Sequence, residues 1–156
     1  MIKINSELIG MTCEKARSSA RKRATHNFHK SPDDPIQRFI NAIEPDTYIR
    51  PHKHENPDKR EIFMVLRGQA IALEFDNNGK VSDYIILGAG TANSGVEIAP
   101  RVWHTIISLE EGTAVYELKD GPYFPLEDKN FAPWAPEEDT KEADEFNKTI
   151  IKELKE

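Results

Sequence analysis

Between about residue 36 and residue 119, hydrophobic residues fall in short runs separated by turn-forming residues. We expect strands over 37–43, 48–54, 61–67, 69–75, 81–87, 102–108 and 113–118. The strongest hairpin signal is Asp76-Asn77-Asn78-Gly79, because Asn-Gly supplies the positive φ angles that a tight β-turn requires. Seven or eight short strands at this spacing predict an all-β sandwich or barrel. Helices do not alternate with these strands, which argues against a parallel α/β sheet.

Helical patterns flank the strands. Residues Ser6 to about Arg23 predict one or two short helical turns, with Thr12 as a candidate N-cap and Ala16 and Ala20 on one face. At the other end, apolar residues recur at helical spacing within a highly charged stretch: Ala143, Phe146, Ile150, Ile151 and Leu154. This stretch, 137–156, is predicted to be an amphipathic C-terminal helix or a charged tail.

The segment 121–136 combines prolines with aromatic residues. Prolines disfavour regular structure and the aromatic side chains need burial, so the segment is predicted to be an ordered strap packed on the barrel. The expected organisation is therefore one domain over 1–136, with helical turns at about 6–23, the barrel at about 36–119 and the strap at 121–136.

Composition narrows the class of protein. A chain of 156 residues with 38% hydrophobic and 31% charged residues is typical of one globular domain. The net charge of −6 argues against nucleic-acid binding, and no apolar run reaches the roughly 20 residues of a membrane helix. Cys13 is the only cysteine and the N-terminus has no apolar signal region, so we expect a cytoplasmic protein.

One basic cluster stands out in this acidic chain: Arg17, Arg21, Lys22 and Arg23. A cluster of this size is typical of a solvated helix face. An anion-binding site is the alternative.

Four residues form a candidate metal site. His52 and His54 are two apart on a predicted strand, so their imidazoles share one face and can chelate one cation. Glu61 begins the next strand, and His104 lies inside a later one. Three histidines and one carboxylate suit one divalent ion per chain, which could be Zn, Fe, Ni, Mn or Cu. Taken singly, each residue also fits a solvated or structural role; their joint order favours the metal.

The order of these residues resembles the two cupin motifs. Pro51-His52-x-His54, then Glu61, six residues and Gly68 resemble G-x5-H-x-H-x3,4-E-x6-G. Gly95…Pro100…His104 and Ser108 resemble G-x5-P-x-G-x2-H-x3-N. The chain departs from these motifs at Asp46, in the longer gap before Glu61, and at Pro100, Arg101 and Ser108. Arg101 replaces a turn glycine, and a side chain at that position disfavours a tight turn.

A narrower set of motifs resembles the WbuC family of cupin-fold metalloproteins. These motifs span roughly 20–136 and are Asn27-Phe-His29, Asp34-Pro-Ile-Gln-Arg38, Tyr48-Ile-Arg-Pro-His-x-His54, Val65-Leu-Arg-Gly68, Trp103-His-Thr105 and Gly121-Pro-Tyr…Asp128-Lys…Phe131-Ala-Pro-Trp-Ala-Pro136. The resemblance implies a cupin double-stranded β-helix, or jelly-roll barrel, with a bound metal. It also implies an association with gene clusters for O-antigen and other bacterial surface polysaccharides, but no reaction.

Further residues are candidates for ligand contact. Arg50 lies on the same predicted face as His52 and could anchor a carboxylate or phosphate, or form an ion pair with Glu61 or another acid. Arg50 and Glu61 are the catalytic candidates; Gln37, Arg38 and Tyr48 join Arg50 as substrate-binding candidates. For a second titratable group near the metal, the sequence offers His26, His29, Tyr48 and Glu97.

Three functions remain open at this point. The first is a metal-dependent isomerase or epimerase acting on a sugar derivative in surface-polysaccharide synthesis, with the cation polarising a carbonyl. The others are an Fe(II)-dependent dioxygenase and a non-catalytic sugar-binding or regulatory module. The expected ligand is small and anionic or sugar-like. We also expect a two-fold homodimer, because the strap and the apolar helix stripe offer surfaces to bury.

Overall fold

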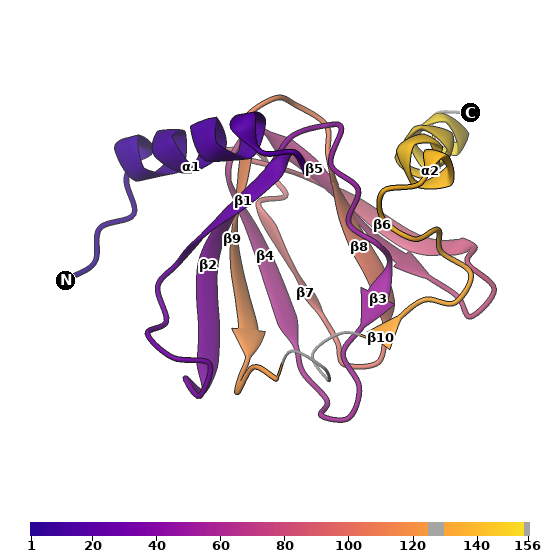
Figure 1. Ribbon diagram of the computed structural model, residues 1–156, viewed down its shortest axis with the longest axis horizontal. Coiled ribbons are helices and arrows are strands. Elements are labelled where there is room, and N and C mark those ends of the chain that lie inside the picture. The colour runs from indigo at the N-terminus through magenta and orange to yellow at the C-terminus, as the bar shows by residue number, and fades with distance from the viewer. Residues whose placement is uncertain (125–129, 155–156) are drawn as a thin grey trace.

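Two five-stranded antiparallel sheets face each other in the computed structural model, which describes residues 1–124 and 130–154 (Figure 1). The first sheet has the order β1 (Arg23–Asn27), β2 (Ile36–Ile43), β9 (Thr113–Asp120), β4 (Glu61–Arg67), β7 (Gly95–Ile98). The second has the order β10 (Asn130–Phe131), β3 (His52–Lys53), β8 (Trp103–Ser108), β5 (Gln69–Phe75), β6 (Val81–Gly88). The predicted all-β jelly roll with short terminal helices is confirmed.

The two helices cover the outer faces of the two sheets. Helix α1 (Ser6–Ser18) packs on β2 and β9 through a cluster that includes Cys13, Ile40 and Ala114. Helix α2 (Lys141–Glu153) packs on β5 and β8, where Ile150 meets Leu73. Figure 1 shows the helices at opposite sides of the molecule. In the described part of the chain, neither helix has the length and apolar character needed to cross a membrane.

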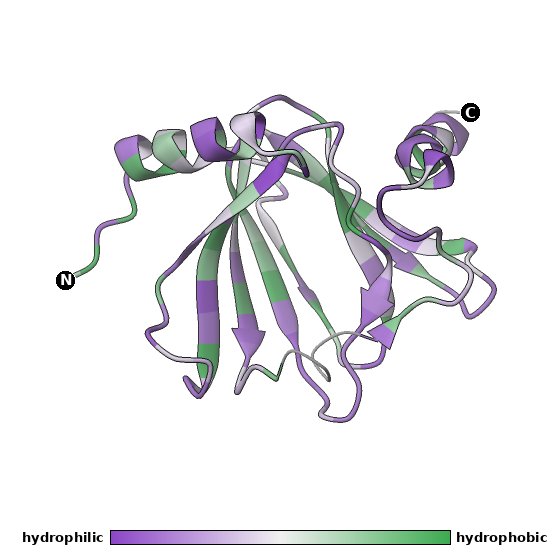
Figure 2. Ribbon diagram, viewed as in Figure 1, coloured by the Kyte–Doolittle hydropathy of each residue, from purple (hydrophilic) through white to green (hydrophobic). Residues whose placement is uncertain are grey.

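Strand alternation separates an apolar interior from a polar end. Between the sheets lies a third cluster, which includes Phe63, Ala72 and Val115. Figure 2 shows hydrophobic residues along the strands, whereas the arrowheads of β9 and β3 are hydrophilic. On the inner face of the first sheet, Lys119 of β9 lies directly opposite Gln37 of β2 on one side and Glu61 of β4 on the other. Polar side chains therefore line one end of the space between the sheets.

The N-terminal prediction needs correction. Residues Ser6–Ser18 form one continuous helix, capped by the side chain of Asn5, which accepts a hydrogen bond from the Leu8 amide. Thr12 lies inside this helix, where its hydroxyl donates to the Leu8 carbonyl. The helix includes Arg17 but ends before Arg21, and Arg23 begins strand β1, which was not predicted. Arg21, Lys22 and Arg23 therefore do not form a helix face.

Most predicted strands agree with the structure to within two residues, but 48–54 does not. Only His52–Lys53 forms a strand there. Pro51 has no amide hydrogen to donate to a sheet, which explains why the ladder does not extend through it. Two short strands were also missed, β7 and β10; β10 lies in the predicted strap and pairs with β3. Pro125, Asp128 and Lys129 of the strap and its motif, and residues 155–156 of the tail, lie outside the described residues.

Two glycines give a paired stability prediction. Gly68, the last residue of the first cupin motif, has a φ of +73°, and an added Cβ would lie 2.5 Å from the Thr113 hydroxyl oxygen and 3.0 Å from its Cα. We expect Gly68→Ala to lower the free energy of unfolding by roughly 1–3 kcal/mol. Gly10 lies in α1 with nothing within 4 Å of an added Cβ. Gly10→Ala should therefore raise the free energy of unfolding by roughly 0.5–1 kcal/mol.

Chemical denaturation of both variants checks this pair. Equal effects of the two substitutions would contradict the strained turn at Gly68.

Candidate metal centre

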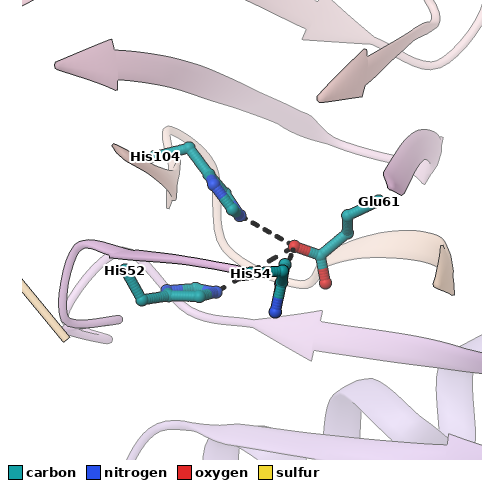
Figure 3. A group of neighbouring side chains, drawn as sticks. All are labelled: His52, His54, Glu61 and His104. Atoms are coloured by element: carbon teal, nitrogen blue, oxygen red, sulfur yellow. Dashed lines mark hydrogen bonds and ion pairs between the residues drawn. The ribbon is translucent and has the colours of Figure 1, made fainter. Parts of the chain in front are cut away.

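Four buried side chains converge where the two sheets meet (Figure 3). His52 lies on β3, His54 directly after it, Glu61 at the start of β4 and His104 on β8. Each is at most 3% exposed. Because His52 and His104 are paired directly across antiparallel strands, their imidazoles lie on one face, with ring centroids 4.5 Å apart. The strands thus bring together residues that are up to 52 positions apart in sequence.

The ligand atoms of these residues lie close enough to share one ion. All four lie within 4.8 Å of one another. Oε2 of Glu61 is 2.8 Å from Nε2 of His104, 3.2 Å from Nε2 of His54 and 4.0 Å from Nε2 of His52. Three imidazole nitrogens and one carboxylate oxygen are a donor set that first-row divalent ions accept.

Backbone contacts fix the tautomers of two histidines. Nδ1 of His52 lies 2.9 Å from the Arg50 carbonyl oxygen, and Nδ1 of His104 lies 2.8 Å from the Val102 carbonyl oxygen. A carbonyl only accepts, so each Nδ1 carries the hydrogen, and Nε2 is the ring atom that faces the centre of the group and is available to bind a cation. This is the outer-shell arrangement found around metal-binding histidines. The residues therefore fit a divalent metal.

The carboxyl of Glu61 is ionised. Burial alone would raise its pKa, but hydrogen bonding with His104 and His54, contact with Glu117 and the charge of Lys119 together hold the pKa well below 4.5. A buried anion of this kind is stabilised by nearby positive charge. Lys119 supplies part of it, and a divalent ion between the three imidazoles would add to it.

The turn that carries the second motif keeps its tight form despite Arg101. This residue has a φ of 68°, the left-handed conformation that glycine adopts most readily. Its backbone N–H donates to the His54 carbonyl at 3.0 Å, and its side chain pairs with Asp58 at 2.9 Å. Arg101 therefore ties the turn before His104 to the segment that bears His54.

A cavity of about 790 Å³ opens from the four-residue group. Both His52 and Glu61 form part of its wall, with apolar contributions from Phe39, Phe63 and Phe131. The described charged residues along the wall comprise five cationic side chains and three carboxylates: Arg21, Arg23, Lys30, Arg50, Lys119, Glu61, Glu117 and Glu138. The cavity is thus net cationic although the chain carries a net charge of −6.

The structure brings two of the four predicted substrate-binding residues into this cavity. Arg50 and Gln37 line it, although the Gln37 amide is engaged in donating to the carbonyls of Pro32 and Asp34. The other two do not line it. Arg38 alternates to the outer face of β2 and pairs with Asp34, and the Tyr48 hydroxyl donates to the Pro136 carbonyl.

The Arg50 guanidinium does not pair with Glu61. Its carboxylate contact is with Glu137, at 4.0 Å, and Glu137 is 80% exposed. The same guanidinium donates to the Ala132 carbonyl at 3.3 Å and lies 5.3 Å from the centre of the Phe131 ring. Nε of Arg50 is buried and has no hydrogen-bond partner within the described residues. Arg50 thus retains donor capacity at the cavity wall.

The candidates for a second titratable group are spread apart. His29 lines the cavity, and its Nδ1 accepts from the Arg38 amide at 3.0 Å, which fixes the orientation of the ring. His26 packs edge-on against Phe28, and Glu97 is an exposed residue of β7 paired with Ile62. Neither lines the cavity in the described part of the chain.

Two cavity residues were missed by the sequence reasoning. Glu117 and Lys119 lie on the inner face of β9, 6% and 5% exposed, and Asn41 donates to Glu117 at 3.0 Å. The sequence signal that could have found them was alternation. Thr113, Val115, Glu117 and Lys119 share one face of β9, and Ala114 and Tyr116 on the opposite face pack under α1. Charged residues in phase with a buried face indicate a functional interior.

The barrel has the cupin jelly-roll fold, and its buried group of three histidines and one glutamate fits a metal ion. Solved structures with this fold include KdgF from Halomonas sp., 16% identical with a TM-score of 0.52 over 69% of this chain and 85% of KdgF. A second is the capsular polysaccharide assembling protein CapF from Staphylococcus aureus, 23% identical with a TM-score of 0.56 over 72% of this chain and 30% of CapF. A third is oxalate oxidase in complex with the substrate analogue glycolate, 16% identical with a TM-score of 0.54 over 74% of this chain and 58% of the oxidase. The chain thus spans less than two thirds of CapF and of oxalate oxidase.

Residues 4–87 match the family described as "Domain of unknown function (DUF6016)", and the chain belongs to that family. A search of curated protein sequences found no match.

Proposed function

We propose that this protein is a metal-dependent cupin enzyme that acts on a small acidic sugar derivative, by an isomerase- or epimerase-type proton transfer. The observation that carries the proposal is the joining of a buried metal-binding group to a cationic cavity in an acidic protein. Four metal ligands are proposed: His52, His54, Glu61 and His104. A volume of about 790 Å³ is sufficient for a ligand of sugar size.

The chemistry that a bound divalent ion supplies in such a site is polarisation of a carbonyl. Arg50 would hold an acidic group of the ligand, since a guanidinium binds a carboxylate through paired hydrogen bonds. Glu117 and Lys119 line the same cavity and are positioned to accept and return a proton on a bound ligand. A purely binding module would not require these two groups, so their presence favours the enzyme.

One structure of similar fold and the motif resemblance both support a sugar ligand. CapF is described as a capsular polysaccharide assembling protein, and the motif resemblance to the WbuC family points to surface-polysaccharide gene clusters. Deuterium exchange from D₂O into candidate sugar acids, followed by NMR, separates an enzyme from a binding module. The two-fold homodimer and the cytoplasmic location stay predictions.

Arg50→Ala tests the anionic character of the ligand. We expect this variant to retain its metal and to bind D-glucuronate about tenfold or more weakly, because hydrogen bonds to charged groups contribute roughly 1.5–3 kcal/mol. Isothermal titration of the metal-loaded protein measures the loss, with neutral D-glucose as the reference ligand.

Arg60→Ala is the matched control, because Arg60 pairs with Asp120 outside the cavity and should leave glucuronate affinity unchanged. Glucose binding as strongly as glucuronate, or equal glucuronate affinity in the Arg50 variant and the wild type, would contradict an acidic ligand.

A further inference from the structure

A carboxylate of the chain itself is held by two arginines in the cavity wall. Oε2 of Glu138 lies 2.6 Å from the Arg21 guanidinium, and Oε1 of Glu138 lies 2.7 Å from that of Arg23. All three residues line the cavity to which His52 and Glu61 also belong. The Arg21 side chain is 59% exposed, so this contact lies at the solvent side of the cavity, whereas the four proposed metal-binding side chains are buried.

The surrounding contacts hold Arg23 in position without Glu138, so another anion could take the place of the Glu138 carboxylate. Arg23 is only 17% exposed and also donates to the Tyr48 carbonyl at 2.8 Å, which fixes its guanidinium independently of Glu138. Glu138 lies in the connection between β10 and α2, next to Asp139, whose φ is 63°. The carboxylate therefore comes from a connecting segment, whereas Arg23 comes from a strand.

Two arginines around one carboxylate form the recognition pattern of an anion site. Planar guanidinium groups match carboxylate and phosphate oxygens, and such pairs are strongest when partly shielded from water. The pattern also gives a role to two of the four residues of the basic cluster. Arg21 and Arg23 line the cavity, whereas Arg17 pairs with Glu14 on α1 and with the buried Glu44 after β2.

We propose that Arg21 and Arg23 form a second anion subsite, which takes a distal carboxylate or phosphate of the ligand and which Glu138 occupies when no ligand is bound. This rests on the proposed function, because the ligand must enter the same cavity. It narrows the ligand class to molecules with two separated acidic groups, such as a sugar diacid or a phosphorylated sugar acid. Glu138 is then an internal competitor that lowers the affinity for every such ligand.

The Glu138→Gln variant tests the proposal, because glutamine keeps the size of the side chain and removes its charge. We expect Glu138→Gln to bind the dicarboxylate D-glucarate about 3- to 10-fold more tightly than the wild type in titration of the metal-loaded protein. D-Glucuronate, which has one carboxylate, should change by less than about twofold. Glu142→Gln is the control, since Glu142 is an exposed residue of α2 that does not line the cavity.

A second variant, Arg21→Gln, guards against a misleading result from altered folding around Glu138. Arg21 is largely exposed, so its loss should leave the melting temperature unchanged and weaken glucarate binding about tenfold. Unchanged or weaker glucarate binding in Glu138→Gln, or unchanged binding in Arg21→Gln, would overturn the subsite.

The same preparations separate the two proposals. Metal content and glucuronate binding are measured for each variant alongside glucarate binding. If metal and glucuronate bind but glucarate shows no dependence on Glu138 or Arg21, the subsite is wrong and the proposed function stands. If neither metal nor any sugar acid binds the wild type, the proposed function itself is wrong.

Discussion

Replacing His104 with alanine is expected to remove most of the metal from the purified protein. His104 contributes the nitrogen that lies nearest to the Glu61 carboxylate, at 2.8 Å, and it comes from a different strand than the other ligands. Loss of a direct ligand should cost more than the roughly 10- to 100-fold in affinity that loss of an outer-shell partner costs. Elemental analysis of protein purified without added metal measures the change.

The same variant gives a stability readout. The four proposed ligands come from β3, the segment after it, β4 and β8, so a bound ion links both sheets. A metal present at a hundredfold above its Kd stabilises the folded state by about 2.7 kcal/mol. Chelation should therefore lower the Tm of the wild type by roughly 5–10 °C. The His104→Ala variant should show little further change with chelator.

His26→Ala serves as the matched histidine control, because His26 lies on β1, packs against Phe28 and is outside the four-residue group. It should keep its metal and its sensitivity to chelator. Full metal content and wild-type melting of His104→Ala would show that His104 is a core histidine and that the four-ligand site is wrong.

The four-residue group could be predicted because each of its residues lies in or beside a strand that a local sequence pattern predicts. Two histidines two apart, a glutamate at a strand start and a histidine inside a later strand keep their order whatever the loops between them do. Their convergence also follows from antiparallel pairing, which places His52 opposite His104. The strand boundaries were predictable for the same reason, since alternation and turn residues act over short distances.

The residues of the cavity wall were harder to predict from the sequence. Their positions depend on which face of a strand each side chain occupies and on contacts between distant segments. Tyr48 was expected beside His52, but the chain around Pro51 leaves the strand, and the Tyr48 hydroxyl donates to Pro136 instead. Arg38 differs from Gln37 by one position, which places it on the opposite face of β2. Arg23 pairs with Glu138 across 115 residues, and no local pattern of the sequence encodes such a pair.

The C-terminal extension, residues 137–156, was also predictable only in part. Its amphipathic pattern predicts the helix, and α2 forms at Lys141–Glu153 with Thr140 as its N-cap. The pattern does not say which surface the apolar face covers. The structure places that face on the outer side of β5 and β8, next to Trp103 and Trp134, and Asn147 donates to the Thr47 carbonyl at 2.8 Å. The extension is therefore packed as part of the fold.

Ile150→Ala is expected to lower the free energy of unfolding by roughly 2–4 kcal/mol, the cost of removing a buried isoleucine side chain from a packed cluster. Ile150 is 7% exposed and packs with Ile71, Leu73 and Ile107. The control is Lys152→Ala, an exposed position of the same helix, which should change stability by less than about 0.5 kcal/mol. Denaturant titration of both variants measures the difference.

The size of the Ile150 effect decides whether α2 is docked in solution. Glu138 precedes this helix by only a few residues, so a docked α2 is also what holds its carboxylate at the cavity. With α2 docked, Ile150→Ala destabilises the whole fold, because the cavity it leaves lies in a cluster shared with β5 and β8. If the loss stays within about 0.5 kcal/mol, like that of Lys152→Ala, the helix is not packed on the sheet and Glu138 has no fixed place beside Arg21 and Arg23.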